Sequence, residues 1–160
     1  MQGNNMDASP FDDSRQATNS MRAPINAARK SITVKAPVGR VYQQWARVEE
    51  LPKFITRLQN VRRIDNTRFS YTWIGGGSDD SQGFFQIVLQ IPGRRIAWRT
   101  LSNGFMSGVV SFEPRSEQET EVTLKIRSIF NPPSLSRRVE EYLSNFKRLV
   151  ESEEGTRHER

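Results

Sequence analysis

The sequence contains no cysteine and a single histidine, His158, close to the C-terminal end. The absence of cysteine excludes a disulfide framework, a thiolate zinc site and a cysteine nucleophile. The polar neighbourhood of His158 is typical of a solvated tail rather than of a catalytic base. The glycine run at 75–77 lacks the lysine and the helix start of a phosphate-binding loop. We therefore expect no catalytic residue, no metal site and no cofactor.

Long apolar runs are also missing, since none approaches the roughly 20 residues that a membrane-spanning helix requires. The N-terminal residues lack the basic and then apolar pattern of a signal peptide. We expect a soluble, cytoplasmic protein. Its hydrophobic fraction is 35% and its mean hydropathy is −0.67, which is low for a compact domain and indicates that part of the chain is unfolded.

Basic residues outnumber acidic ones, 24 to 18, which gives a net charge of +6 and an isoelectric point near 10.2. An arginine-rich exterior explains this balance, and so does a partner with an acidic surface, such as a ribosome or a nucleic acid. Arg57, Arg62 and Arg63 are the candidate contacts for such a partner.

The chain divides into one domain and two tails. Residues 1–28 are rich in Asn, Ser, Asp and Gln, and so polar a segment cannot bury enough surface to offset its ordering entropy. We expect disorder over 1–28, a folded domain over 29–153 and a disordered polar tail over 154–160.

The folded part opens with a half-buried strand, KSITVKA (30–36), in which apolar and polar residues alternate. The next stretch, VYQQWARVEELPKF (41–54), predicts a short amphipathic helix and then a second short helix that begins at Pro52. Pro52 disfavours helical geometry at Leu51, so we expect the break between the two helices at this point.

Everything from Gln59 to Pro132 is predicted to be short strands joined by tight turns, which favours an antiparallel sheet. Within these strands Gln86, Gln90 and Arg99 alternate with apolar residues and are assigned to the outer face. A final apolar stripe predicts a long C-terminal helix over residues 135–150. The fold class is therefore α+β: a curved antiparallel sheet of about seven strands, two short helices after the first strand, and a long C-terminal helix packed across the sheet.

This order of elements resembles the START-like, or helix-grip, superfamily (SRPBCC), and most closely its polyketide cyclase/dehydrase and coenzyme Q-binding branch. The resemblance is carried by SITVKAPVGRVYQQWARVEELPKF, PGRRIAW, SGVVSFEP, NPP and NFKRLVE, over about residues 30–152. It implies a cavity between the sheet and the last helix that takes a small hydrophobic ligand, such as a lipid, a quinone or a polyketide-like compound.

The alternation of the strands and the stripe of the last helix give the residues that line such a cavity. The candidates are Tyr71, Trp73, Phe85, Ile87, Trp98, Thr100, Met106, Val110, Leu124, Ile126, Ser128, Tyr142 and Phe146. Thr100 and Ser128 would orient a carbonyl or a hydroxyl. The alternative is that these side chains meet and fill the space as an ordinary core.

Three functions follow from these observations. The first is binding or transport of a hydrophobic molecule, since the inward positions are apolar. The second is a cyclase or dehydratase in the same cavity, although the domain has no His, no Cys and no inward acidic residue for acid–base work. The third is association with a ribosome or a nucleic acid through the arginine clusters.

Overall fold

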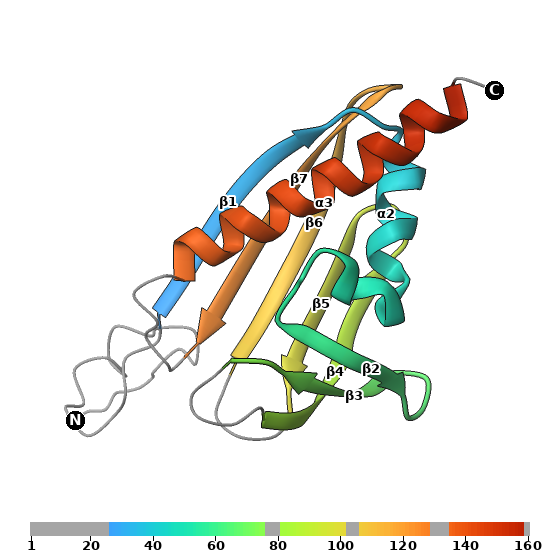
Figure 1. Cartoon of the computed structure of the whole chain (residues 1–160). Helices are drawn as coiled ribbons and strands as arrows, with labels where there is room; N and C mark the ends of the chain where they lie inside the picture. Colours follow the sequence, from blue (N-terminus) through green and yellow to red (C-terminus); the bar gives the residue numbers. More distant parts are fainter. Residues whose placement is uncertain (1–25, 76–80, 102–105, 129–134, 159–160) are drawn as a thin grey trace, which may run out of the picture.

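The computed structural model describes residues 26–75, 81–101, 106–128 and 135–158 of the chain (Figure 1). Its elements in chain order are β1 (Asn26–Val34), α2 (Val38–Ala46), the 3₁₀ helix η1 (Val48–Lys53), β2 (Leu58–Arg63), β3 (Arg68–Trp73), β4 (Ser81–Ile91), β5 (Arg95–Thr100), β6 (Met106–Ser116), β7 (Glu119–Ser128) and α3 (Leu135–His158).

The seven strands form one antiparallel sheet in the order β1-β7-β6-β5-β4-β3-β2. Strands β1 and β2, which follow one another in the sequence, lie at opposite edges, and α2 and η1 connect them. The sheet is curved, and α3 runs obliquely across it (Figure 1) and contacts β1 and β7. This arrangement confirms the predicted helix-grip fold.

Side-chain alternation decides which face of each strand is buried. In β7, Val122, Leu124 and Ile126 are buried, whereas Lys125 between them is exposed. The same period of two places Val110 and Phe112 of β6 in the core. A strand with one buried face is strongly specified by such a pattern, because a shift of one residue would expose the whole apolar set.

Strand β4 breaks this alternation with a bulge at Val88. Ile87 lies opposite Trp98 on β5, but Leu89 lies opposite Ala97, so Val88 is the extra residue. An extra residue exchanges the two faces for the rest of the strand. Leu89 is consequently 40% exposed, whereas Gln90 lies opposite the buried Ile96, on the inner face at the margin of the core. The Gln90 side chain remains exposed but donates a 3.0 Å hydrogen bond to the Tyr42 hydroxyl. The prediction that Gln90 belongs to the outer face is therefore wrong.

The helical connection after β1 also differs from the prediction in its details. Helix α2 ends at Ala46, and η1 then contains Pro52 rather than beginning there. The break lies at Arg47, whose ψ of 80° leaves the helical region. A proline has no backbone N–H to donate in the interior of an α-helix. Pro52 is therefore better accommodated in a short 3₁₀ turn than in a continuous α-helix.

Aromatic packing holds this connection against α3. The Trp45 ring lies 4.9 Å from the Phe54 ring and 5.0 Å from the Phe146 ring, centroid to centroid. The Asn145 side chain of α3 adds a 3.1 Å hydrogen bond to the Phe54 carbonyl. We call the segment 45–58, which includes η1, the helical plug.

The ordered domain begins earlier and ends later in the sequence than predicted. Strand β1 begins at Asn26, opposite Ser128, and Ala28 is buried. Apolar alternation did not indicate this early start, because backbone hydrogen bonding to β7 does not require it. Residues 26–28 and 154–158 are thus structured, which corrects the predicted tails at these positions. Residues 1–25 and 159–160 lie outside the described ranges, so the disorder expected there stays a prediction.

Ion pairs hold the turns of α3 that lead into this extension. Glu153 pairs with Arg40 of α2, and Glu151 pairs with Lys147 at 2.6 Å. Glu, Arg and Lys are also good helix formers. The composition that indicated a solvated tail is therefore equally compatible with a helix anchored by its charged face.

Candidate ligand cavity

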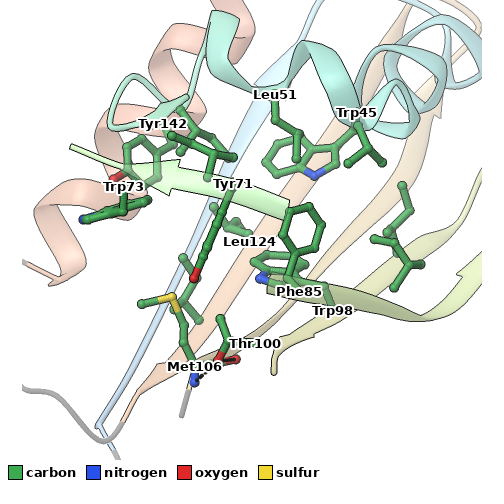
Figure 2. A pocket seen from close by; sticks show the side chains of 16 residues that line it. Trp45, Leu51, Tyr71, Trp73, Phe85, Trp98, Thr100, Met106, Leu124 and Tyr142 are labelled. Atoms are coloured by element: carbon green, nitrogen blue, oxygen red, sulfur yellow. Dashed lines mark hydrogen bonds between the residues drawn. The ribbon is translucent and has the colours of Figure 1, made fainter. Parts of the chain in front are cut away.

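A cavity of about 100 Å³ lies between the inner face of the sheet, the helical plug and α3 (Figure 2). Its lining consists of Trp45, Val48, Leu51, Ile55, Leu58, Tyr71, Trp73, Phe85, Ile87, Ile96, Trp98, Thr100, Met106, Leu124, Ile126 and Tyr142. The wall is thus almost entirely aliphatic and aromatic, which is typical of sites for apolar ligands.

Three parts of the fold contribute to the wall. Strands β3 to β7 supply ten residues, which form the floor and one side. The helical plug supplies five residues, and α3 supplies Tyr142 alone. In the view of Figure 2, Tyr142 and Trp73 are seen at one end of the lining, and Thr100 and Met106 at the other end.

The floor depends on a close approach between Trp98 and a glycine. Trp98 of β5 lies opposite Gly108 of β6, and a Cβ atom built at Gly108 would collide with the six-membered part of the Trp98 ring. The indole therefore lies across the backbone of β6 instead of standing upright in the cavity. A glycine in a strand interior commonly marks such an approach.

Ten of the thirteen predicted residues are brought together in this wall. They are Tyr71, Trp73, Phe85, Ile87, Trp98, Thr100, Met106, Leu124, Ile126 and Tyr142. Their common position follows from the alternation of the strands and from the stripe of α3. That they bind a ligand stays a prediction.

The other three predicted residues, Val110, Ser128 and Phe146, are buried elsewhere in the core. Phe146 lies one helical turn beyond Tyr142 and is covered by Trp45 and Phe54 of the helical plug. Alternation along a strand, or spacing along a helix, indicates which face of the element a residue occupies. It does not show whether that part of the face borders a cavity or is covered by other side chains.

Six lining residues were missed: Trp45, Val48, Leu51, Ile55, Leu58 and Ile96. Five of them belong to the helical plug. Their apolar spacing showed that they are buried, but it did not show that the plug reaches over the sheet to the cavity. Ile96 lies two residues before Trp98 in β5 and so points to the same face of the sheet. This alternation was sufficient to predict Ile96 as a lining residue.

The Thr100 hydroxyl is occupied by the protein itself. It donates to the Met106 carbonyl at 3.2 Å and accepts from the Met106 amide at 3.0 Å. Its single proton is therefore committed to the backbone. This pair fastens the end of β5 to the start of β6, so Thr100 has no proton left for the ligand contact that the sequence suggested.

Among the lining residues that the structure describes, Tyr71 and Tyr142 carry the remaining hydroxyl groups. Burial raises the pKa of Tyr71 above its usual value of 10. Burial likewise raises the pKa of Tyr142, while the charge of Arg138 opposes this effect. Both side chains are therefore neutral phenols at physiological pH and can donate a hydrogen bond.

Charged side chains are absent from the described lining of the cavity. Across the ranges that the structure describes, no group of three or more His, Cys, Asp or Glu residues is placed to hold a metal ion. Acid–base chemistry in this cavity would have to use the two tyrosines or water.

Two of the three arginines proposed as external contacts have roles within the fold. The Arg57 guanidinium donates to the carbonyls of Ile74 and Gly75, at 3.3 and 3.1 Å. Arg63 lies 4.8 Å above the Phe69 ring. Cation–π stacking and carbonyl bonding explain these positions without a partner. Association with a ribosome or an acidic surface stays a prediction.

Among the described helices, none combines the length and the apolar character needed to cross a bilayer.

Comparison with known proteins gives a family match over most of the chain. The model of a family described as polyketide cyclase / dehydrase and lipid transport matches residues 34–145. An uncharacterised 17.2 kDa protein encoded between melC2 and rnhH in Streptomyces lincolnensis is 28% identical over 131 residues, which cover 81% of this chain and 85% of that protein.

Solved structures share the fold. A Deinococcus radiodurans protein is 28% identical, with a TM-score of 0.65 over 77% of this chain and 95% of its own. A START superfamily protein from Mycobacterium smegmatis superimposes with a TM-score of 0.64 at 10% identity, over 79% of this chain and 95% of its own. The Zhui aromatase/cyclase from a Streptomyces species superimposes with a TM-score of 0.58 at 16% identity, over 81% and 88%. At such low identity the last two show the architecture alone.

Proposed function

Because the chain belongs to the polyketide cyclase/dehydrase and lipid transport family, we propose that it binds a small hydrophobic molecule in the cavity described above. The observation that carries this proposal is the wall itself: aromatic and aliphatic side chains surround an open space, and no charged group is among the described lining residues. Burial of apolar ligand surface would supply the binding free energy, at about 25 cal/mol per Å².

The volume of the cavity limits the size of the bound group. Drug-sized ligands usually occupy about 300–1,000 Å³, whereas a cavity of about 150 Å³ accepts benzene. A space of about 100 Å³ is smaller than that benzene site, so it encloses at most one ring or a short branched chain, and a ring would require a small shift of the wall. A lipid, a quinone or a polyketide-like molecule would place one such group inside and would displace part of the wall to insert more.

Tryptophan fluorescence tests this proposal directly, because all three tryptophans of the protein, Trp45, Trp73 and Trp98, line the cavity. Bromobenzene is a probe of suitable size that quenches indole fluorescence through its heavy atom. Titration should give saturable quenching. Ile87→Phe adds volume at a partly buried wall position and should weaken the binding at least tenfold. Quenching that never saturates, or that is the same in Ile87→Phe, would contradict the proposal.

Native mass spectrometry of the protein purified from its own cells is the complementary experiment. A co-purifying mass that is released by denaturation would identify the ligand class, and its loss in Ile87→Phe would locate it in the cavity. An empty protein in repeated preparations, together with no saturable bromobenzene binding, would support a filled core instead.

A cyclase or dehydratase is the second candidate, and the two neutral tyrosine hydroxyls of the wall favour it. A phenol in an apolar site can donate a hydrogen bond to a carbonyl oxygen and so assist an aldol-type ring closure. The positive charge of Arg57 lowers the pKa of Tyr142, although burial raises this pKa by more. Faster cyclisation of a soluble poly-β-ketone by the wild type than by the double variant Tyr71→Phe/Tyr142→Phe would support catalysis; equal rates would leave binding as the function.

A further inference from the structure

One residue of the cavity wall, Tyr142, carries a buried polar atom that has no partner among the described residues. The Tyr142 side chain is 5% exposed, and its hydroxyl oxygen has no hydrogen bond within the part of the chain that the structure describes. Most buried polar groups in folded proteins are paired, because an unpaired one loses its bonds to water and gains nothing in return. An exception in a ligand cavity therefore points to a group that arrives with the ligand.

The other buried tyrosine provides the contrast. Tyr42 is 9% exposed, and its hydroxyl accepts a 3.0 Å hydrogen bond from Gln90. Tyr42 does not line the cavity, whereas Tyr142 does. The fold thus satisfies the hydroxyl in the closed core and leaves the one at the cavity unpaired.

The other hydroxyl groups of the wall are less suited than Tyr142 to donate a hydrogen bond to a ligand. Thr100 has committed its proton to the Met106 carbonyl. Tyr71 is only half-buried, so water reaches it more easily than it reaches Tyr142. Among the wall hydroxyls, Tyr142 therefore gains most from a bond to a bound molecule, because its alternative is no bond at all.

We propose that the Tyr142 hydroxyl donates a hydrogen bond to an oxygen atom of the ligand, and that the ligand is consequently an apolar molecule carrying a carbonyl or a similar acceptor oxygen rather than a pure hydrocarbon. This inference rests on the proposed binding function. It adds a specificity determinant: the sheet and the helical plug select for apolar shape, and the single contact from α3 selects for oxygen.

Two probes of nearly identical shape separate these contributions. Acetophenone and α-methylstyrene differ only in that a C=O group replaces a C=CH₂ group. Isothermal titration calorimetry with the full-length protein measures both dissociation constants. A neutral hydrogen bond in a protein contributes about a factor of three to ten in affinity. Because the C=O group also loses its hydration on binding, the informative quantity is the ratio of the two affinities. We expect this ratio to favour acetophenone by such a factor more in the wild type than in a protein without the Tyr142 hydroxyl.

Tyr142→Phe removes only the hydroxyl oxygen and should weaken acetophenone binding about three- to tenfold relative to α-methylstyrene, while α-methylstyrene binds as well as before or better. Tyr42→Phe is the matched control, since it removes a buried tyrosine hydroxyl outside the cavity and should leave the preference intact. Melting curves of both variants show that they are folded.

The outcomes distinguish the inference from the function on which it rests. An affinity ratio that is the same in Tyr142→Phe as in the wild type would overturn the role of Tyr142 and leave the cavity as a binding site. Failure of both probes to bind would overturn the binding function, and the inference with it.

Discussion

Trp98 and Gly108 face one another across strands β5 and β6, and the glycine leaves the room in which the indole ring lies. The pair determines how much of the cavity stays open, because any side chain at position 108 would push the ring away from the backbone. Gly108→Ala should therefore lower the free energy of unfolding by about 1–3 kcal/mol, as overpacking does. It should also reduce bromobenzene binding, because the displaced ring enters the cavity.

Gly39→Ala is the control for this experiment. A Cβ atom at Gly39 in helix α2 meets nothing within 4 Å, so the substitution should be neutral or should stabilise by up to about 1 kcal/mol. Chemical denaturation of both variants provides the comparison. Equal stabilities of the two variants would show that the Trp98 ring does not depend on the glycine.

Phe146 provides a test of the boundary between the cavity and the core. It is fully buried against Trp45 and Phe54, and so Phe146→Ala should cost about 3–5 kcal/mol of stability. Phe146→Leu keeps most of the volume and should retain probe binding with a smaller loss. A mild effect of the alanine substitution would mean that Phe146 faces open space, as the sequence suggested.

The inward turn of Gln90 leads to a prediction about two glutamines of the same strand. Gln90→Leu leaves the Tyr42 hydroxyl without its donor and should cost about 1 kcal/mol. Gln86→Leu changes a side chain on the outer face and should stay within about 0.5 kcal/mol of the wild type. Thermal unfolding of the two variants measures the difference. The reverse order would mean that the bulge at Val88 is absent in solution.

Acid should weaken the contact between α3 and Lys35, the residue that follows β1. Glu151 accepts from Lys147 at 2.6 Å and from the Lys35 amide at 2.8 Å. Burial alone would raise the pKa of the Glu151 carboxyl, but these two hydrogen bonds and the charges of Lys147 and Lys35 together outweigh burial and hold its pKa below the usual 4.5. The stabilisation is therefore complete above pH 4.5, the value in the unfolded chain, and is lost as the pH falls through the lower value of the folded state.

Glu151→Gln should remove this part of the acid dependence, so the stabilities of variant and wild type should converge at low pH. Glu140→Gln removes the same charge from an exposed position of α3, near Lys30, and should keep the wild-type profile. Urea unfolding between pH 3 and pH 7 compares the three proteins. Parallel curves for Glu151→Gln and the wild type would contradict the assignment.

How far the sequence predicts this molecule depends on the range over which each signal acts. Strict alternation located the inner face of β7, and helical spacing placed Tyr142 on the inner side of α3. The bulge at Val88 carries no glycine or proline to mark it, and one unmarked residue was enough to reverse the assignment of Gln90. A pattern within one strand cannot reveal a bulge, because the bulge is defined by the pairing of that strand with its neighbour.

The cavity shows the same limit on a larger scale. The strands revealed their inward residues, but Leu51 and Ile55 reach the cavity only because the plug is held over the sheet by contacts between Trp45, Phe54 and Phe146. These three residues are separated by up to about a hundred positions in the sequence. Distances of this kind are a property of the tertiary structure and leave no periodic signal.

The strand order also has a consequence for the time course of folding. Strand β1 pairs only with β7, and the Ser31 and Thr123 hydroxyls that bond across this pair are 92 residues apart in the chain. Closing so large a loop is entropically costly, and the intervening hairpins from β2 to β7 require no such closure. During synthesis we therefore expect β1, which leaves the ribosome before the other strands of this sheet, to be the last of them to find its neighbour. Because α3 packs on both β1 and β7, this final pairing and the docking of the helix complete the domain together.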